Sequence, residues 1–398
     1  MPVQESPLER LQRHARDRAL DTAVLEHSGR AWVSLTWNEL HRRVVDGAAG
    51  MIEAGVNPGQ VVVIRVPAGI RQLELELATR VAGAVPLLLP ERMDPAEVAR
   101  LLEEVAVRLV IVDHESRLAL LRRAGLAGAQ LFECDDHSWE RLRAMGLERR
   151  KRQPDMLSWV DSVRVGRPSG AVLGLLREKA DAWLFRPESS GALADLSADD
   201  VVVLTGEATD RFTTLVRDAH LTAGCAMAWV EGPFQLEAAL AHVSPTHIFL
   251  DHATSRVVED LLEVARIDGV AWHETPREVL ESASAQAADA RLRGRTRKLA
   301  AEVSALAPWW GGRLRVLVLD ARVNRTLSAL ATALDFRLGR IAHHPAVRLE
   351  LAREHTGVTV PAAPAAPLAE VSLPRRGRAG AELDSAFSIA GSGGAQER

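Results

Sequence analysis

Apolar and polar positions in the first part of the chain fall into blocks that predict strands separated by helices. The apolar runs 61–66 and 85–89 are typical of strands that are buried on both faces. Between them, residues 69–82 carry apolar side chains at helical spacing, and Gly83 ends this segment. Strands that alternate with helices at this spacing predict a parallel sheet covered by helices on both faces.

The helix before the first of these strands has clear start and stop signals. Thr36 and Glu39 have the spacing of a capping box, in which each side chain accepts a hydrogen bond from the other residue's backbone N–H. Gly55 can adopt the left-handed conformation that ends a helix, and Pro58-Gly59 then makes a turn. Five apolar residues share one face of this helix: Leu40, Val44, Ala48, Met51 and Ile52.

The same alternation continues, less regularly, through the rest of the chain. A polar, arginine-rich stretch over 149–170 predicts a loop or an insertion. The remaining pattern predicts strands at 109–112, 130–134, 201–204, 227–230, 247–250 and 336–341, and helices from Asp94, at 138–145, near 236–242 and over 275–307.

Length and charge narrow the class of protein. The chain has 398 residues, 47% of them hydrophobic, which is enough for one large or two modest domains. A net charge of −4 gives no indication of nucleic acid or of an anionic membrane as a partner. No apolar run approaches the roughly 18 residues that a membrane span requires. Cys134 and Cys225 are far apart, so we expect reduced thiols and a cytoplasmic protein.

Two long segments resemble a known family. LTWNELHRRVVDGAAGMIEAGVNPGQVVVIRVP (35–67) and ELELATRVAGAVPLLLPERMDPAEVARLLEE (74–104) are similar to the AMP-forming acyl-CoA synthetases of the adenylate-forming superfamily, most closely the long-chain fatty-acid branch. LTAGCAMAWVEGPFQLEAALAHVSPTHIFLD (221–251) and WWGGRLRVLVLDARV (309–323) resemble later segments of the same family. These positions belong to the scaffold, so the resemblance concerns the fold before it concerns activity.

The resemblance implies an α/β fold of parallel-sheet layers flanked by helices, as in the large N-terminal domain of these enzymes. We expect a first α/β subdomain at 1–195, with an irregular insertion at about 146–195, and a truncated second α/β subdomain at 196–355. Residues 356–398 are rich in Pro, Ala and Gly and predict a disordered tail. The family's C-terminal lid, with its catalytic lysine, has no counterpart in the sequence.

The phosphate-binding loop of the family is replaced here. In the family, a strand after a D-D-x-A signature leads into Y-T-S-G-T-T-G-x-P-K-G, whose small residues and backbone N–H groups grip the triphosphate. This chain has DDVVVLTGEATDRF (199–212), which contains one glycine and no lysine in the loop. Glu207 and Asp210 would repel a triphosphate. The remnant nucleotide-binding positions are Thr205, Gly206, Thr209 and Asp320.

The chain also contains no tyrosine, so the family's G-Y-G-x-T-E adenylate motif cannot exist in its usual form. We therefore predict a degenerate, catalytically inactive relative without catalytic residues. We expect no cofactor, with ATP or AMP and Mg²⁺ needed only if some activity remains. Two alternatives stay open: an AMP-dependent long-chain fatty-acid CoA ligase with parts supplied by another chain, and an unrelated α/β enzyme or binding protein.

An inactive relative would act by binding, either to a protein partner or to an acyl or acyl-CoA ligand. In the tail, Leu383 and Phe387 are four residues apart, so a short helix would present both on one side, with Ile389 next to them. These three residues are the predicted docking positions for a partner. The spacing of five between His242, His247 and His252 does not bring imidazoles together, so we expect no metal site. Acid pairs such as Asp135-Asp136 and Asp199-Asp200 are typical of caps and turns.

Overall fold

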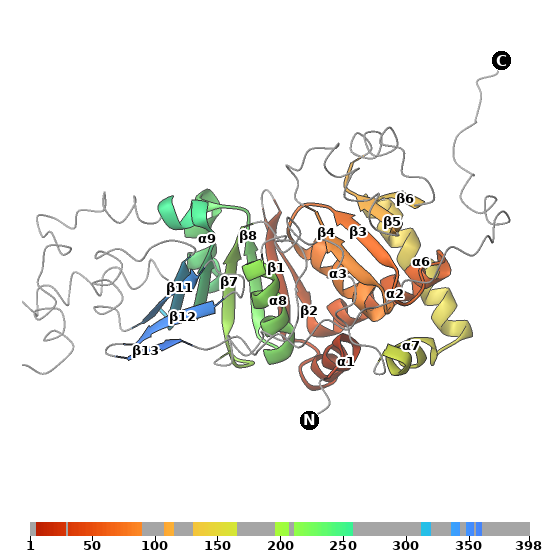
Figure 1. The fold of residues 1–398 in the computed structure, drawn as a ribbon, viewed down its shortest axis with the longest axis horizontal. Helices are drawn as coiled ribbons and strands as arrows, with labels where there is room; N and C mark the ends of the chain where they lie inside the picture. The colour runs from red at the N-terminus through yellow and green to blue at the C-terminus, as the bar shows by residue number, and fades with distance from the viewer. Residues whose placement is uncertain are drawn as a thin grey trace, which may run out of the picture.

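The fold contains two β-sheets that lie side by side along the long axis of the molecule (Figure 1). In this computed structural model, the residues described are 5–28, 31–89, 107–114, 130–164, 196–206, 211–257, 312–319, 336–342, 348–353 and 356–359. The helices α1, α2, α3 and α8 lie around the junction of the two sheets (Figure 1).

The smaller sheet has four parallel strands in the order β4-β3-β5-β6. Its strands are β3 (Val61–Arg65), β4 (Val85–Leu88), β5 (Val107–Val112) and β6 (Gln130–Glu133), and its helices are α2 (Trp37–Glu53), α3 (Ile70–Val81), α6 (Asp136–Arg152) and α7 (Met156–Arg164). Every residue of β3 is buried, as the apolar run predicted. The capping box of Thr36 and Glu39 is confirmed, and Gly55 has the left-handed backbone conformation that follows a helix end.

The larger sheet has nine strands in the described part of the chain, in the order β13-β12-β11-β10-β9-β7-β8-β1-β2. Its centre, from β11 to β1, is parallel, and antiparallel strands extend it at both edges. The strands are β1 (Thr22–Ser28), β2 (Ala31–Thr36), β7 (Val201–Thr205), β8 (Ala226–Val230), β9 (His247–Leu250), β10 (Val316–Leu319), β11 (Arg337–Ala342), β12 (Arg348–Arg353) and β13 (Thr356–Thr359). The helices α1 (Pro7–Asp17), α8 (Arg211–Ala223) and α9 (Pro233–Val243) accompany this sheet.

The α/β class is therefore confirmed, with parallel-sheet layers flanked by helices. The sequence pattern missed the hairpin of β1 and β2, which pairs with β8, about 200 residues later in the chain. A segment of the predicted first subdomain thus completes the sheet of the second. The tail predicted from residue 356 begins with β13, because Thr356–Thr359 pairs with β12. Residues 360–398, and the helices predicted from Asp94 and over 275–307, lie outside the described residues.

The helix predicted at 138–145 is confirmed but is longer than expected, and the loop predicted from residue 149 was wrong as far as residue 164. Helix α6 runs from Asp136 to Arg152, and α7 follows after a short turn. Asp135 caps α6, and its carboxylate accepts a hydrogen bond of 2.6 Å from the backbone N–H of Ser138. The four basic residues of the last turn, 149–152, lie where they interact favourably with the negative end of the helix dipole. The part of the predicted insertion over 165–195 is outside the described residues.

Glycines allow α2 and α6 to cross at very short distance. A Cβ at Gly146 would overlap the carbonyl oxygen of Asp46 and lie 2.5 Å from the amide nitrogen of Gly50. A Cβ at Gly50 would in turn overlap the carbonyl of Leu142. The two backbones are therefore in direct contact, and no larger residue fits at either glycine without moving a helix.

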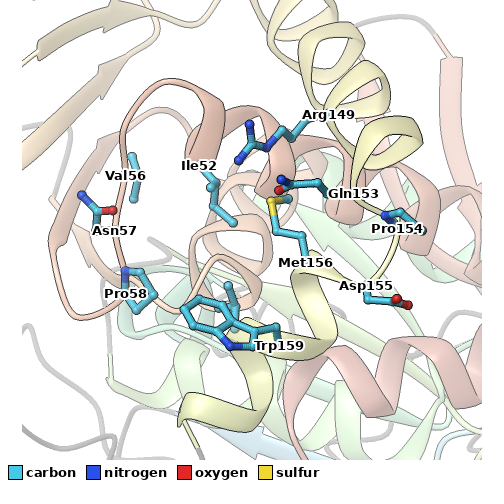
Figure 2. A pocket seen from close by; sticks show the side chains of 11 residues that line it. Ile52, Val56, Asn57, Pro58, Arg149, Gln153, Pro154, Asp155, Met156 and Trp159 are labelled. Atoms are coloured by element: carbon cyan, nitrogen blue, oxygen red, sulfur yellow. The ribbon is translucent and has the colours of Figure 1, made fainter.

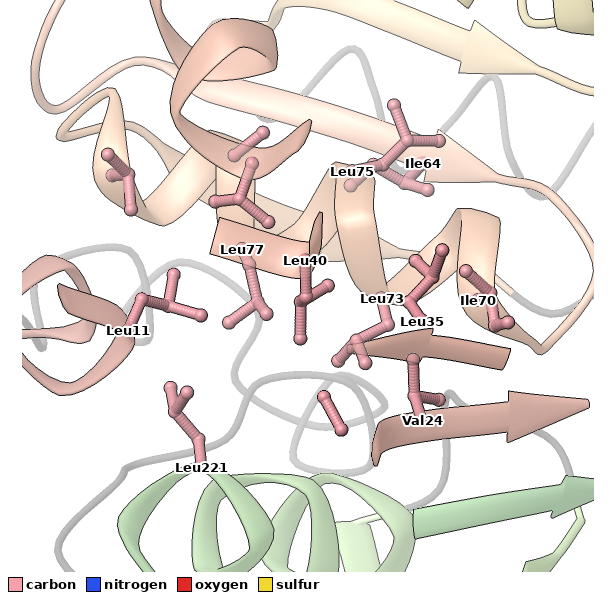
Figure 3. Close-up of a cluster of buried hydrophobic side chains, with 14 of the residues drawn as sticks. Leu11, Val24, Leu35, Leu40, Ile64, Ile70, Leu73, Leu75, Leu77 and Leu221 are labelled. Atoms are coloured by element: carbon pink, nitrogen blue, oxygen red, sulfur yellow. The ribbon is translucent and has the colours of Figure 1, made fainter. Parts of the chain in front are cut away.

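One hydrophobic core connects the two sheets. Figure 3 shows side chains from four helices converging on the strands β1 and β2, among them Leu11 of α1, Leu40 of α2, Leu77 of α3 and Leu221 of α8. All four are at most 3% exposed. The chain segments before and after residue 195 thus share a single interior.

An aromatic stack inside this core brings α1, α2 and α8 together. The indole of Trp37 is fully buried, with the ring of His14 at 4.5 Å and the ring of His220 at 5.1 Å between centroids. Burial lowers the pKa of His220 to about 3. The imidazole of His220 is therefore neutral in the folded protein throughout the physiological range.

We expect Gly146→Ala to destabilise the protein by about 1–3 kcal/mol, because the new methyl group overfills the α2–α6 contact. Replacement of glycine by alanine elsewhere inside a helix ordinarily stabilises the protein by about 0.5–1 kcal/mol. Urea denaturation measures the free energy of unfolding. The exposed substitution Ala144→Gly in the same helix is the control for helix propensity alone. A stabilised Gly146→Ala variant would contradict the close helix contact.

We expect His220→Gln to reduce the dependence of stability on pH. Only the unfolded chain protonates His220 as the pH falls from 6.5 towards 3, so this group removes about 1.4 kcal/mol of stability per pH unit over that range. The variant should lack that contribution in urea denaturation at pH 7, 6 and 5. A measurement at pH 8, where neither state holds the proton, gives the packing cost of the substitution. Equal slopes for variant and wild type would show that His220 is not buried as described.

Candidate functional site

The predicted nucleotide-binding positions lie at the carboxyl ends of the central strands of the larger sheet. In parallel α/β sheets this edge is where ligands usually bind. Thr205 is the last residue of β7, Gly206 follows it, and Asp251 follows the neighbouring strand β9. These three residues form the described part of the candidate site.

The hydroxyl of Thr205 is committed to Asp251. It donates to Oδ1 of Asp251 at 3.1 Å and accepts from the backbone N–H of Asp251 at 3.0 Å. The same carboxylate oxygen accepts from the backbone N–H of Thr254 at 3.0 Å, which begins the helical segment 252–257. Thr205 is fully buried. The carboxylate therefore serves as a helix cap and as an anchor between two strand ends.

Gly206 lies in close contact with Asp251. Its φ of +106° lies in the region that favours glycine, and a Cβ at this position would be 2.8 Å from Cβ of Asp251. The strand end is thus closed on one side by a carboxylate-bearing residue. The remaining residues of the loop, including Thr209, Glu207 and Asp210, lie outside the described part of the chain.

The described residues of this site do not fit a triphosphate. A phosphate at the end of β7 would meet the Asp251 carboxylate, and the single O–H donor of Thr205 is already bonded to that carboxylate. A phosphate cradle needs free N–H or hydroxyl donors and commonly a cation. Among the described residues of the strand end, neither Thr205 nor Asp251 supplies one.

The structure does not describe the other predicted positions. Asp320, which follows β10, and the tail residues Leu383, Phe387 and Ile389 lie outside the described residues. Their assigned roles remain predictions.

The acid pairs act as the sequence predicted. The Asp200 carboxylate accepts hydrogen bonds of 2.8 Å from both the backbone N–H and the hydroxyl of Ser197, which closes the turn before β7. Arg315 and His247 also pair with Asp200. Burial alone would raise the pKa of Asp200, but the bonds from Ser197 and the neighbouring groups hold its pKa below the usual value.

The three histidines are separate. His247 is buried at the start of β9 and bonded to Thr246 at 2.9 Å, whereas His242 is exposed on α9 and stacks on Trp32 at 5.0 Å. His252 follows the opposite end of β9. Within the described ranges, no three His, Cys, Asp or Glu residues are grouped so that they could hold a metal ion.

The sequence analysis missed a cluster of buried charges between the two sheets. We define this junction cluster as Arg10 of α1, Glu76 and Arg80 of α3, and Arg217 and Asp218 of α8. Ion pairs connect Arg217 to Glu76 at 2.5 Å, Arg80 to Glu76 at 2.6 Å, and Arg10 to Asp218 at 3.5 Å. Burial lowers the pKa of Arg217 and raises the pKa of Asp218.

The junction cluster has a structural role. Its side chains come from helices that belong to different sheets, and the guanidinium of Arg217 also lies over the indole of Trp229 at 6.0 Å. A sequence signal for it exists: α3 reads IRQLELELATRV, in which charged and apolar residues alternate instead of occupying separate faces. A helix of this pattern has polar residues on sides that are buried.

Comparison with known proteins gives matches to one family. Residues 11–164 match the family described as "AMP-binding enzyme". The chain is 33% identical over 94 residues to 2-methylpropanoate–CoA ligase CCL4 of Humulus lupulus, which covers 24% of this chain and 17% of that protein. It is 35% identical over 104 residues to naringenin synthase of Pestalotiopsis fici, which covers 26% of this chain and 4% of that protein. The match thus spans about a sixth or less of these curated relatives.

Solved structures with similar folds cover more of the chain. The N-terminal domain of FACL13 from Mycobacterium tuberculosis has a TM-score of 0.61 at 12% identity, over 87% of this chain and 79% of that one. A long-chain-fatty-acid–CoA ligase from Archaeoglobus fulgidus has a TM-score of 0.58 at 13% identity, over 84% and 63%. Residues 11–164 thus match the AMP-binding enzyme family, and the described residues share the fold of the N-terminal domain of FACL13.

Proposed function

We propose that this chain is a non-catalytic relative of the acyl-CoA synthetases that acts by binding a protein partner or an acyl-type ligand. The proposal rests on the two hydrogen bonds between Thr205 and Asp251. They use the polar groups at the strand end where a relative would bind phosphate. The sequence of the loop supports it, because Glu207 and Asp210 bring two further carboxylates and no lysine is present.

The chain retains the scaffold of the shared fold but differs from the family at the phosphate loop. The family match ends at residue 164, before the strand that leads to the phosphate loop. Strands, caps and core of the shared fold remain, since folding requires them. A binding function needs only this scaffold and a surface, whereas acyl-adenylate formation needs charge neutralisation and alignment at the triphosphate.

In the described residues, none of the helices is long and apolar enough to cross a membrane.

A second candidate is a long-chain fatty-acid CoA ligase that forms an acyl-adenylate, with missing parts supplied by another chain. The similarity to solved structures of fatty-acid CoA ligases favours this candidate. It requires ATP and Mg²⁺, and it predicts ATP–pyrophosphate exchange in the presence of its partner.

Titration of the full chain with ATP–Mg²⁺, AMP and a long-chain acyl-AMP analogue separates the two candidates. A ligand at a hundred times its Kd stabilises a protein by about 2.7 kcal/mol, which thermal unfolding resolves as a shift of a few degrees. We expect no shift with any of the three, and no heat of binding in calorimetry. A saturable shift with ATP or the adenylate analogue would refute the non-catalytic assignment and favour the ligase.

Substitution of Thr205 tests the anchor directly. We expect Thr205→Val to cost about 1–3 kcal/mol, because the backbone N–H of Asp251 loses its acceptor at a buried position. Thr205→Ser keeps the hydroxyl and is the matched control, with a smaller loss from the missing methyl group. Urea denaturation compares the two. If both variants lose the same stability, the hydroxyl does not hold the strand ends together.

A further inference from the structure

An apolar groove lies on the side of the molecule that carries α6 and α7 (Figure 2). Its volume is about 480 Å³, within the range of ligand and peptide pockets. The end of α2, the turn at 56–58, the end of α6 and the start of α7 form its walls. Ile52, Met156 and Trp159 supply its accessible apolar lining, and the buried side chains of Val56 and Val160 border it. We refer to it as the α6–α7 groove.

Trp159 makes this groove a candidate docking surface. Its side chain is 63% exposed, whereas Leu157 and Val160 of the same helix are buried in the protein. Figure 2 shows the indole of Trp159 facing the groove opposite Pro58. An exposed tryptophan beside an apolar hollow is typical of an interface centre, because its burial contributes more than that of other residues.

Positive charge lies at the α6 end of the groove. The guanidinium groups of Arg149 and Arg152 both pair with the single carboxylate of Glu53, at 3.2 and 3.1 Å. Within these two ion pairs, one carboxylate therefore faces two guanidinium groups. The Arg152 side chain is 60% exposed. Asp155, which also lines the groove, adds a negative charge. An occupant should thus be apolar in the middle and carry acidic residues towards Arg149 and Arg152.

We propose that the α6–α7 groove binds the segment 381–389 of this chain. The segment reads AELDSAFSI: a short helix would present Leu383 and Phe387 on one side, and Glu382 and Asp384 flank the first of them in sequence. The apolar pair matches the apolar lining, and the two acids match the arginines at the α6 end. The inference deepens the proposed function, since it assigns a receptor to the predicted docking positions.

The length of chain between the structure and the segment permits this contact. Leu383 is 24 residues beyond Thr359, the last residue described. A chain of that length reaches about 80 Å when extended. The larger sheet, which separates β13 from the helices beside β2, is about 40 Å across. The extended segment is thus about twice as long as the larger sheet is wide, which leaves chain to continue from β2 towards the groove.

Site-specific photocrosslinking in the full-length chain tests the proposal. p-Benzoylphenylalanine replaces Phe387, and mass spectrometry maps the crosslinked peptides after illumination. We expect the crosslinks to fall on 52–58 and 153–160, within one chain or between two. Trp159→Ala and, separately, Leu383→Glu should each reduce their yield at least five-fold. Leu20→Ala, at a leucine that is 86% exposed elsewhere, is the matched control and should leave the yield unchanged.

Crosslinks that fall elsewhere, including on 165–195, would overturn the proposal, as would a yield that is indifferent to Trp159→Ala and Leu383→Glu. Leu383→Glu lies outside the described fold, so the test does not depend on whether the Trp159 variant folds. The nucleotide titrations decide the proposed function separately. A chain that binds no nucleotide but gives no groove crosslinks would retain the non-catalytic assignment and lose only this inference.

Discussion

Helix α3 can occupy the middle of the molecule only because arginines of α2, of α8 and of α3 itself neutralise its carboxylates. Ten of its twelve residues are buried, Glu74 and Glu76 among them. Arg43 and Arg71 pair with Glu74, whose other partner is the indole N–H of Trp139 at 2.9 Å. Arg217 pairs with Glu76 from the other sheet. Loss of one partner of such a pair generally costs about 3–5 kcal/mol, because it leaves a buried charge uncompensated.

This arrangement links the two sheets through ion pairs as well as through the shared core. The partners of Glu74 come from the layer of the smaller sheet, and the partner of Glu76 comes from α8 of the larger one. A hydrogen bond of 2.6 Å from the backbone N–H of Ile70 to the Glu26 carboxylate adds a second link, from β1 to the start of α3. Burial raises the pKa of Glu26, although this bond opposes the shift. Apolar packing alone would allow the layers to slide, whereas paired charges fix their register.

The sequence predicted the elements whose pattern is local and missed those that depend on distant partners. The strands β3, β4, β7, β8 and β9 are short apolar runs, and their burial follows directly from that composition. Helix α6 has few apolar residues, and its buried contact face is Trp139, Leu142 and Gly146. A glycine contributes nothing to a hydrophobic pattern, so close backbone packing leaves no amphipathic signal. The hairpin of β1 and β2 was missed because its neighbour β8 is contributed by a distant part of the chain.

The candidate site was predictable in its location and not in its contacts. The position of Thr205 and Gly206 at a strand end followed from the run of valines before them, but no local pattern predicts that Thr205 pairs with Asp251, 46 residues later. That pairing changes the chemistry of the edge. In a phosphate-binding protein, the groups at a strand end must remain unpaired until the ligand arrives, and this keeps the loop less stable than its surroundings. Here the hydroxyl and the carboxylate satisfy each other, and the carboxylate also caps the next helix. A strand end of this kind gains stability from the same atoms that a catalytic relative would reserve for its substrate, so the proposed non-catalytic function and the retained fold would both follow from this one contact.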